Sequence, residues 1–165
     1  MVTDLLDFAR PTSLHLVQEP LAPIIESALD AVRRANPSAT TEISVSIEEG
    51  VPDLQCDVQL MRQAIVNLVS NALQSPERTG PVRITVGMMS RDRIRLTVID
   101  DGAGVANDIA DRIFRPFFTT RATGTGLGLA VVQRIVNAHG GEVVQRATPG
   151  GGATFEVQLP IRPAP

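Results

Sequence analysis

Three glycines lie two residues apart in the stretch Gly124-Thr-Gly-Leu-Gly128, directly before an apolar segment with helical spacing. Glycine weakens a helix, so its repetition here needs a reason. The sequence has no GxxxxGK[ST] string, and Leu129 stands where a GxGxxG pattern would need its last glycine. Small residues still let backbone N–H groups approach an anion, and a helix N-terminus adds about half a positive charge. The stretch therefore predicts either a phosphate-binding helix start or a packing or hinge device.

An aspartate follows a short apolar strand pattern in Val98-Ile-Asp-Asp-Gly-Ala-Gly-Val105, so Asp100 enters a turn of the form GxG. A carboxylate at a strand end can accept a hydrogen bond from an exocyclic amine. The glycines Gly102 and Gly104 would let a flat ring lie close to the backbone. The same pattern also occurs in solvated turns, so alone it leaves both a base-binding site and a plain turn open.

Two asparagines, Asn67 and Asn71, lie four residues apart on a predicted helix and therefore share one face. Amide oxygens at this spacing can hold a hydrated Mg²⁺ and its bound phosphate oxygens, although helix asparagines can also be merely exposed polar residues. The positions around them are apolar almost all round the helix: Ile65, Val66, Leu68, Val69 and Leu73. Two amides in such surroundings need buried partners or a ligand.

The elements that must position these residues follow from periodicity and turn signals. Helical spacing predicts helices at Leu21–Ala35, Val58–Ser75, Gly126–Ala138 and, as a short piece, Asn107–Phe114. Alternation and turn residues predict strands at Ile43–Ile47, Val82–Met88, Ile94–Ile99, Glu142–Arg146 and Ala153–Leu159. Asp57 is the predicted N-cap of the second helix. Helices with a mostly antiparallel sheet, without regular βαβ alternation, predict an α+β fold built as a two-layer sandwich.

Composition limits the class of protein. The chain has 165 residues, 43% hydrophobic residues and a net charge of −3, which fits one soluble domain. No apolar run reaches the roughly 18 residues of a membrane span, and the start MVTDLLDFAR lacks the layout of a secretory signal, so a cytoplasmic domain is predicted. The mild acidity and the lack of Trp and Tyr give no case for nucleic-acid binding.

Two further features have simple structural interpretations. Cys56 is the only cysteine, so an internal disulfide is excluded, and we interpret it as a small half-buried strand residue. The tail Pro160–Pro165 is rich in proline, which cannot continue a strand, and we expect it to be free.

Four ordered motifs together resemble the N, G1, F and G2 boxes of the ATP-binding catalytic domain of sensor histidine kinases, within the wider group shared with gyrase, Hsp90 and MutL. They are Asn67-Leu-Val-Ser-Asn71-Ala72, Asp100-Asp-Gly-Ala-Gly104, Ile113-Phe-Arg-Pro-Phe-Phe-Thr-Thr-Arg121 and Gly124-Thr-Gly-Leu-Gly-Leu129. The start Asp4–Pro11 resembles the end of the preceding dimerisation helix and its linker. The resemblance thus implies a linker region at 1–20, the catalytic domain at 21–160 and a disordered tail at 161–165.

The resemblance implies a Bergerat-type sandwich in which ATP lies between the helices and a lid at about 106–125. Asp100 would accept the adenine amino group, and guanine would put a carbonyl oxygen against that carboxylate. A site built on such a bond can discriminate by roughly 10⁴-fold. Asn71 would be the principal Mg²⁺ ligand, with Asn67 beside it, and these two are the implied catalytic residues. Around the phosphates the resemblance implies Thr119, Thr120, Arg121, Gly124, Thr125, Gly126, Leu127, Gly128 and Leu129.

Some members of this set have alternatives. Arg121 is a candidate phosphate contact or a solvated lid arginine. Phe114, Phe117 and Phe118 can form a small core under the lid or dock onto the phosphoacceptor domain. The sequence also departs from the family pattern at Gln63, where relatives often carry Glu, and at Ala153, where the last glycine box often continues with Thr.

The two histidines are not interpreted as catalytic. His15 lies five residues before Pro20, as in a phosphoacceptor motif, but Leu16 follows it where the family usually has an acidic residue. His15 also comes after the linker-like segment, and too few residues separate it from the asparagines for a helical hairpin. His139 ends a helix just before two glycines, where the helix dipole favours a cation, and we interpret it as structural.

The implied function is a catalytic domain that binds Mg²⁺-ATP and gives its γ-phosphate to a histidine on a separate dimerisation domain. Phosphoryl transfer needs mainly positioning and charge neutralisation. Asn67 stands where ATPases of the wider group have a water-activating glutamate, so hydrolysis should be slow. The implied partners are the dimerisation and phosphotransfer domain and a response regulator receiver domain, without nucleic acid or direct membrane contact, and the isolated chain should be a monomer.

Three other function classes stay open. The domain could be a nucleotide-binding regulatory module without transfer activity. It could be a protein serine kinase of the anti-sigma type, although the full GTGLGL box and the linker-like start favour the histidine kinase. It could also be an interaction domain with a degenerate site that binds no nucleotide.

Overall fold

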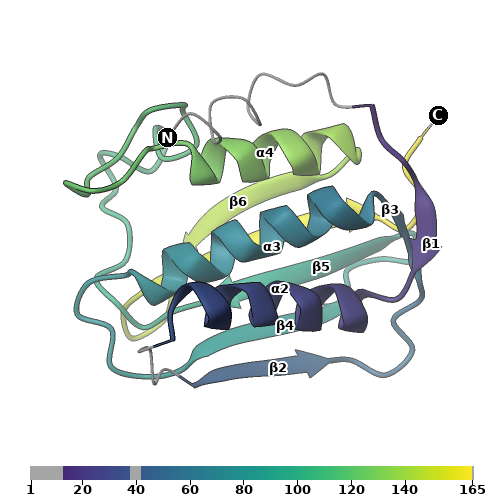
Figure 1. The fold of residues 1–165 in the computed structure, drawn as a ribbon, viewed down its shortest axis with the longest axis horizontal. Coiled ribbons are helices and arrows are strands. Elements are labelled where there is room, and N and C mark those ends of the chain that lie inside the picture. The colour runs from purple at the N-terminus through teal and green to yellow at the C-terminus, as the bar shows by residue number, and fades with distance from the viewer. Residues whose placement is uncertain (1–12, 38–41, 165) are drawn as a thin grey trace.

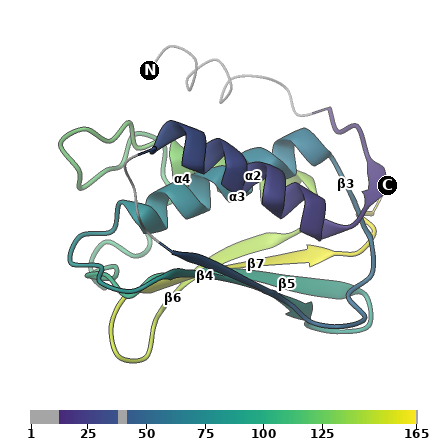
Figure 2. The same cartoon turned by 60° about the horizontal axis from the view of Figure 1, so that its bottom comes forward.

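A computed structural model describes residues 13–37 and 42–164 of the chain. Five strands form one sheet in the order β2-β4-β5-β7-β6, and helices cover one of its faces (Figures 1 and 2). The strands are β2 (Ile43–Ile47), β4 (Val82–Met88), β5 (Arg93–Ile99), β6 (Glu142–Ala147) and β7 (Ala153–Pro160). The helices are α2 (Leu21–Ala35), α3 (Val58–Leu73) and α4 (Gly128–Ala138). Only β2 pairs in parallel, so the predicted two-layer α+β fold with a mostly antiparallel sheet is confirmed.

The core lies between the helices and the sheet. Alternate residues of the central strands are fully buried there, including Ile84 on β4 and Leu96 on β5. Helix α2 places a stripe against them at Ile25, Ala28 and Val32, the spacing that a one-sided helix requires. The two layers thus hold α3, which carries both asparagines, against the sheet.

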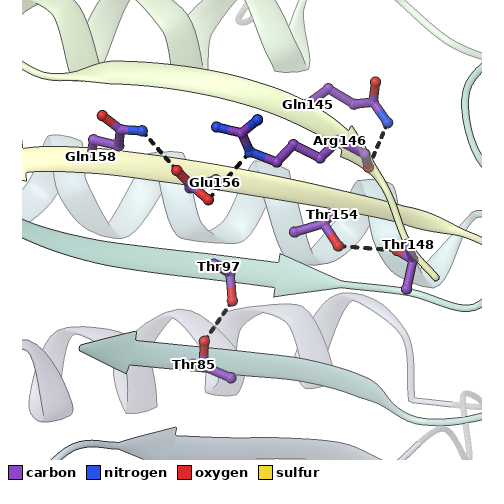
Figure 3. A network of polar contacts seen from close by, with 8 residues as sticks. All are labelled: Thr85, Thr97, Gln145, Arg146, Thr148, Thr154, Glu156 and Gln158. Carbon is purple, nitrogen blue, oxygen red and sulfur yellow. Dashed lines mark hydrogen bonds and ion pairs between the residues drawn. The ribbon is translucent and has the colours of Figure 1, made fainter. Parts of the chain in front are cut away.

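The opposite face of the sheet is polar, and its side chains bond to one another (Figure 3). Thr85 and Thr97 share a hydrogen bond of 2.6 Å across neighbouring strands. Glu156 accepts a hydrogen bond from Gln158 at 2.7 Å and lies 3.5 Å from the Arg146 guanidinium. Contacts of this kind, within a strand and between strands, satisfy polar groups on a face that no helix covers among the described residues.

A second, two-stranded sheet was not predicted. It joins β1 (Val17–Glu19) to β3 (Leu54–Cys56) in antiparallel pairing. Three residues per strand are too few to show alternation in a sequence. Cys56 is a strand residue as expected, but it is fully buried instead of half-buried. Burial, with the nearby charges of Asp57 and Glu19, raises the pKa of its thiol to about 11, so the sulfur stays protonated at neutral pH.

Several element ends differ from the sequence prediction by one or two residues. Helix α3 ends at Leu73, and α4 begins at Gly128 because Gly126 has a φ of +70°, outside helical geometry. Strand β7 includes Pro160, where a missing N–H is tolerated at a strand end. The next residue, Ile161, donates to the Asp92 carbonyl and accepts from the Gln55 N–H, so the ordered body extends into the predicted tail.

The short helix predicted at Asn107–Phe114 is wrong. The segment forms successive turns whose N–H groups bond to the carbonyl three residues earlier, the tighter spacing that does not propagate far. Pro116 offers no N–H at the end of this stretch. These bonds are Ile109 to Ala106, Arg112 to Ile109, Arg115 to Arg112 and Phe118 to Arg115.

Asp57, before the first residue of α3, contacts His139, after the last residue of α4. Asp57 caps α3 as predicted, with one oxygen accepting from the Gln59 and Leu60 N–H groups. Its own N–H donates to His139 Nε2 at 3.0 Å, and His139 Nδ1 lies 2.7 Å from the Ile135 carbonyl. Nδ1 must therefore carry the proton and Nε2 must not. His139 is structural as expected, but the ring is neutral, which corrects the cation expected from the helix dipole.

Two findings concern the chain as a whole. Among residues 13–37 and 42–164, no helix has the length and apolarity that crossing a membrane requires. The linker-like segment Asp4–Pro11 lies outside the described residues.

Candidate functional site

A cavity of about 360 Å³ opens between α3, the end of β5 and the segment from Gly104 to Gly128. This volume lies in the range of small-molecule sites. The cavity brings together most of the residues that the sequence singled out: Asn67, Asn71, Asp100, Gly104, Thr119, Thr120, Arg121, Gly124, Thr125, Gly126, Gly128 and Leu129. Residues separated by more than sixty positions therefore line one space, as a ligand site requires.

The two asparagines have different partners. Asn67 donates from Nδ2 to the Gly128 carbonyl at 3.3 Å, which ties α3 to the first residue of α4. Asn71 accepts at Oδ1 a hydrogen bond of 3.2 Å from the Arg121 guanidinium. Both side chains are half-buried and line the cavity. Each of the two amides thus has one partner within the fold.

Arg121 reaches across the cavity from the lid segment to α3. Its guanidinium donates to the Asn71 side chain, to the Asn71 backbone carbonyl at 3.1 Å and to Gln74 Oε1 at 2.9 Å. Burial lowers the pKa of Arg121, and the negative charge of Asp100 opposes that shift. The Arg121 side chain is thus half-buried and bonded to the end of α3. Gln74 was missed, because nothing in the sequence places the residue that follows this helix opposite the lid.

Asp100 lies at the end of β5 and is 2% exposed. Its Oδ1 accepts from the Gly102 N–H at 2.9 Å, and its own N–H donates to the Ala153 carbonyl at 3.0 Å. Gly102 does not line the cavity; it is buried behind the turn, where a Cβ atom would come 2.7 Å from the Pro76 carbonyl oxygen. Close packing thus requires glycine at position 102, and the backbone N–H of that residue orients the carboxylate.

Asp101 fixes the turn from its outer side. Its carboxylate accepts from Thr79 Oγ1 at 3.0 Å and from the Gly80 N–H at 2.7 Å. Slight desolvation would raise the pKa of Asp101, but these hydrogen bonds outweigh it and the pKa is lowered. The loop after α3 and the turn that holds Asp100 are therefore fastened together, a contact that the sequence does not reveal.

Gly126 and Gly128, at the start of α4, have different surroundings. A Cβ on Gly126 would come 2.5 Å from the Phe117 carbonyl carbon and 2.7 Å from the Phe118 nitrogen, and its φ is positive. A Cβ on Gly128 would meet nothing within 4 Å. Leu127 between them is 3% exposed, so its side chain belongs to the core and not to the cavity. Close packing explains Gly126, whereas Gly128 leaves open space at the helix start.

The three phenylalanines of the lid base divide into two kinds. Phe114 meets Phe155 edge to face at 6.3 Å, and Arg112 lies 5.0 Å from the centre of the Phe118 ring. Both rings pack against the core. Phe117 is 64% exposed and has a φ of +64°. The core interpretation of the cluster is therefore confirmed for two residues, and the third presents its ring to solvent.

The sequence also missed the apolar wall of the cavity. Ile109, Ile113, Phe155 and Ala153 line it, and the first two come from the segment predicted as a helix. An apolar wall, one buried carboxylate and backbone N–H groups at a helix start form a site for a ligand with a flat base at one end and anionic groups at the other.

This fold and this cavity together define an α+β nucleotide-binding domain with a lid over its site. The family of histidine kinase-, DNA gyrase B- and HSP90-like ATPases matches residues 56–163, and the chain belongs to this family. The match includes every residue of the cavity.

Similar proteins narrow the class further. The histidine-protein kinase AtoS of Escherichia coli is 36% identical over 163 residues, which are 99% of this chain and 27% of AtoS. Full-length ShkA, solved in complex with AMPPNP, is 30% identical with a TM-score of 0.85 over 99% of this chain and 35% of ShkA. The fold also matches ThkA, solved in complex with the response regulator TrrA, at 23% identity and a TM-score of 0.82 over 98% of this chain and 46% of that one.

The chain spans about a quarter to a third of these curated relatives, with 27% of AtoS and 35% of the Salmonella typhimurium sensor kinase ZraS covered. Family, fold and relatives agree on its type. It is an ATP-binding catalytic domain of the two-component sensor histidine kinase type.

Proposed function

We propose that this domain holds Mg²⁺-ATP in the cavity and presents the γ-phosphate to a histidine of a separate dimerisation domain. The observation that carries the proposal is Asp100, a buried carboxylate that lines the cavity and is oriented by the Gly102 N–H. A buried carboxylate needs donors, and the adenine amino group supplies one. Guanine offers a carbonyl oxygen at that position and would leave the carboxylate unpaired.

The phosphates would lie toward the other end of the cavity. Gly128 leaves open space at the start of α4, where the first N–H groups of the helix and the helix dipole favour anions. Arg121 adds a positive charge from the lid side, and Thr119, Thr120 and Thr125 add polar groups around it. This arrangement supports phosphate binding by backbone and guanidinium together.

The residues present also fit a magnesium ion. Asn71 lines the cavity, and its Oδ1 accepts a hydrogen bond from the cationic Arg121 side chain, so this oxygen already faces a positive charge. Asn71 and, beside it, Asn67 would hold the ion through amide oxygens, with water and phosphate oxygens as its other ligands. When bound, the ion neutralises charge on the phosphoryl group that is transferred.

The nucleophile must come from another domain. An asparagine at position 67 cannot act as a base toward water, so ATP hydrolysis by this chain should be slow. The partners that we propose are the dimerisation and phosphotransfer domain and a receiver domain; the ThkA–TrrA complex supports the second by analogy. Phe117, exposed beside the lid, is the proposed apolar contact for the first. We propose neither nucleic acid nor membrane as a partner of this domain.

Calorimetric titration with ADP and ATP in the presence of Mg²⁺ tests the proposal. Wild type should bind both, GTP should bind far more weakly, and Asp100→Asn should lose the preference for adenine. Absence of binding by wild type would favour the degenerate interaction domain. Binding without phosphoryl transfer to a supplied dimerisation domain would favour the regulatory module, and transfer to a protein serine would favour the anti-sigma type.

A further inference from the structure

The turn between β6 and β7 lies behind the turn that carries Asp100. Thr148 donates its N–H to the Gly152 carbonyl at 3.2 Å and accepts from the Gly151 N–H at 3.0 Å. Gly150, Gly151 and Gly152 all have positive φ, at +88°, +111° and +103°.

Gly152 is pressed against the backbone on both sides of the Asp100 turn. A Cβ on Gly152 would overlap the Asp100 carbonyl group and come 2.7 Å from Asp101 Cα. A Cβ on Gly104, the last residue of that turn, would come 2.9 Å from the Gly152 carbonyl oxygen. Gly152 is buried, yet it does not line the cavity. Any influence on a ligand therefore passes through its neighbours that line the cavity, and Asp100 is the one whose backbone it touches most closely.

Two hydrogen bonds join the same surfaces. The Asp100 N–H donates to the carbonyl of Ala153, the residue after Gly152, at 3.0 Å. Thr148 Oγ1 lies 3.5 Å from the Asp100 carbonyl oxygen and 3.0 Å from Thr154 Oγ1; Figure 3 shows this threonine pair where the hairpin begins. The backbone of Asp100 is thus held from the side away from the cavity.

We propose that Gly152 is a positioning residue for Asp100 and so sets how strongly the site prefers adenine. This inference rests on the proposed role of Asp100. A hydrogen bond between a carboxylate and an amine weakens steeply beyond about 3.2 Å, so a backbone shift of a few tenths of an ångström removes much of it. Any side chain at position 152 forces such a shift, because the atoms that it meets are backbone atoms and cannot rotate away.

The hairpin supplies a matched control. Gly151 has a φ close to that of Gly152, so Gly151→Ala and Gly152→Ala both force a non-glycine residue into a left-handed conformation. A Cβ on Gly151 meets nothing within 4 Å, whereas a Cβ on Gly152 meets Asp100. The difference between the two variants therefore isolates the contact from the backbone strain.

The experiment measures the affinities of wild type and both variants for ADP and inosine diphosphate, which has a carbonyl in place of the amino group. Binding is titrated at a temperature where circular dichroism shows each variant folded. Gly152→Ala should lose at least about tenfold in ADP affinity with little change for inosine diphosphate, so the preference collapses. Gly151→Ala should keep the wild-type preference. A merely structural loss would lower both affinities equally.

A second readout does not depend on a nucleotide. The Gly102 amide bonds to the Asp100 carboxylate, so its NMR shift reports where that carboxylate lies. It should move in Gly152→Ala and stay in Gly151→Ala. If Gly152→Ala does not fold, Thr148→Val takes its place. This variant should lower the preference for ADP over inosine diphosphate. An unchanged preference would overturn the inference. Equal preference in the two alanine variants also overturns it, whereas wild type that binds no adenine nucleotide overturns the proposed function instead.

Discussion

Asp57 shows how one side chain can serve two parts of the fold. One of its carboxylate oxygens accepts from the first N–H groups of α3, and the other accepts from the His15 N–H at 3.0 Å. Burial would raise the pKa of Asp57, but these backbone hydrogen bonds outweigh it and lower the pKa. The ionised form is therefore the one that the folded state prefers.

Replacing the Asp57 carboxylate should make the free energy of unfolding depend less on pH in the acid range. Asp57→Ala should cost about 1 to 2 kcal/mol at pH 7, because a cap is lost. A lowered pKa in the folded state means that the contribution is present above the unfolded pKa of about 4 and is lost as pH falls through the folded value. Urea unfolding at pH 7, 5 and 3 should show the gap between wild type and variant closing only at the lowest pH.

The control for this prediction is Asp53→Ala, which removes a carboxylate from an exposed position four residues earlier. Its effect should be small at every pH. A gap between wild type and Asp57→Ala that stays constant from pH 7 to pH 3 would contradict the assigned hydrogen bonds.

At the scale of elements, two glycines lie at the start of α4, and replacing each of them should have a different effect on stability. Gly126→Ala should disrupt the lid base, because its Cβ would strike the backbone between Phe117 and Phe118 at a positive φ. Gly128→Ala should leave the fold intact or stabilise it by up to about 1 kcal/mol, because alanine suits a helix better than glycine. Thermal unfolding of both variants distinguishes these outcomes.

The Gly128→Ala variant also tests phosphate binding at the start of α4. Gly128→Ala adds a methyl group where the structure has open space beside the cavity, so it should weaken ATP binding more than adenosine binding. Titration of both ligands measures the difference. An equal loss of affinity for ATP and for adenosine would contradict phosphate binding at the start of α4.

Long elements were predictable, and short or irregular ones were not. Helix α2 has the predicted bounds because its apolar stripe repeats through four turns before Pro37. Strands β1 and β3 have three residues each and depend on each other, which no local pattern reveals. The segment at 107–114 has apolar residues at helical spacing, yet those residues face the cavity from consecutive turns.

The site was predictable where a residue type carries its chemistry, as with Asp100, Asn67, Asn71 and Arg121. What the sequence could not show is how these groups are held. Gln74 and Asp101 act through contacts across the fold, at 2.9 Å to Arg121 and at 2.7 Å to the Gly80 N–H. Such tertiary contacts join positions with no pattern between them.

At the scale of the whole molecule, the arrangement of His15 and the cavity decides where a phosphoryl group can go. The His15 N–H bonds to Asp57 at the beginning of α3, whereas Asn71 lies near the end of that helix. At 1.5 Å per residue, Asp57 is about 20 Å from Asn71 and about 15 Å from Asn67, which also lines the cavity. In-line transfer needs reacting atoms within about 3.5 Å, so a nucleotide in this cavity cannot reach His15 of the same chain.

Incubation of this chain with Mg²⁺-ATP should therefore give no phosphohistidine, and a supplied dimerisation domain should become phosphorylated at its own histidine. Mass spectrometry at neutral pH, with His15→Ala as the control, measures both outcomes. Because His15 is exposed, two chains could react with each other, and that reaction would grow with protein concentration while an intramolecular one would not. Phosphorylated His15 at a rate independent of concentration would contradict the distance set by α3. Transfer to the supplied domain that is lost in Asp100→Asn would place the source of the phosphoryl group in the cavity.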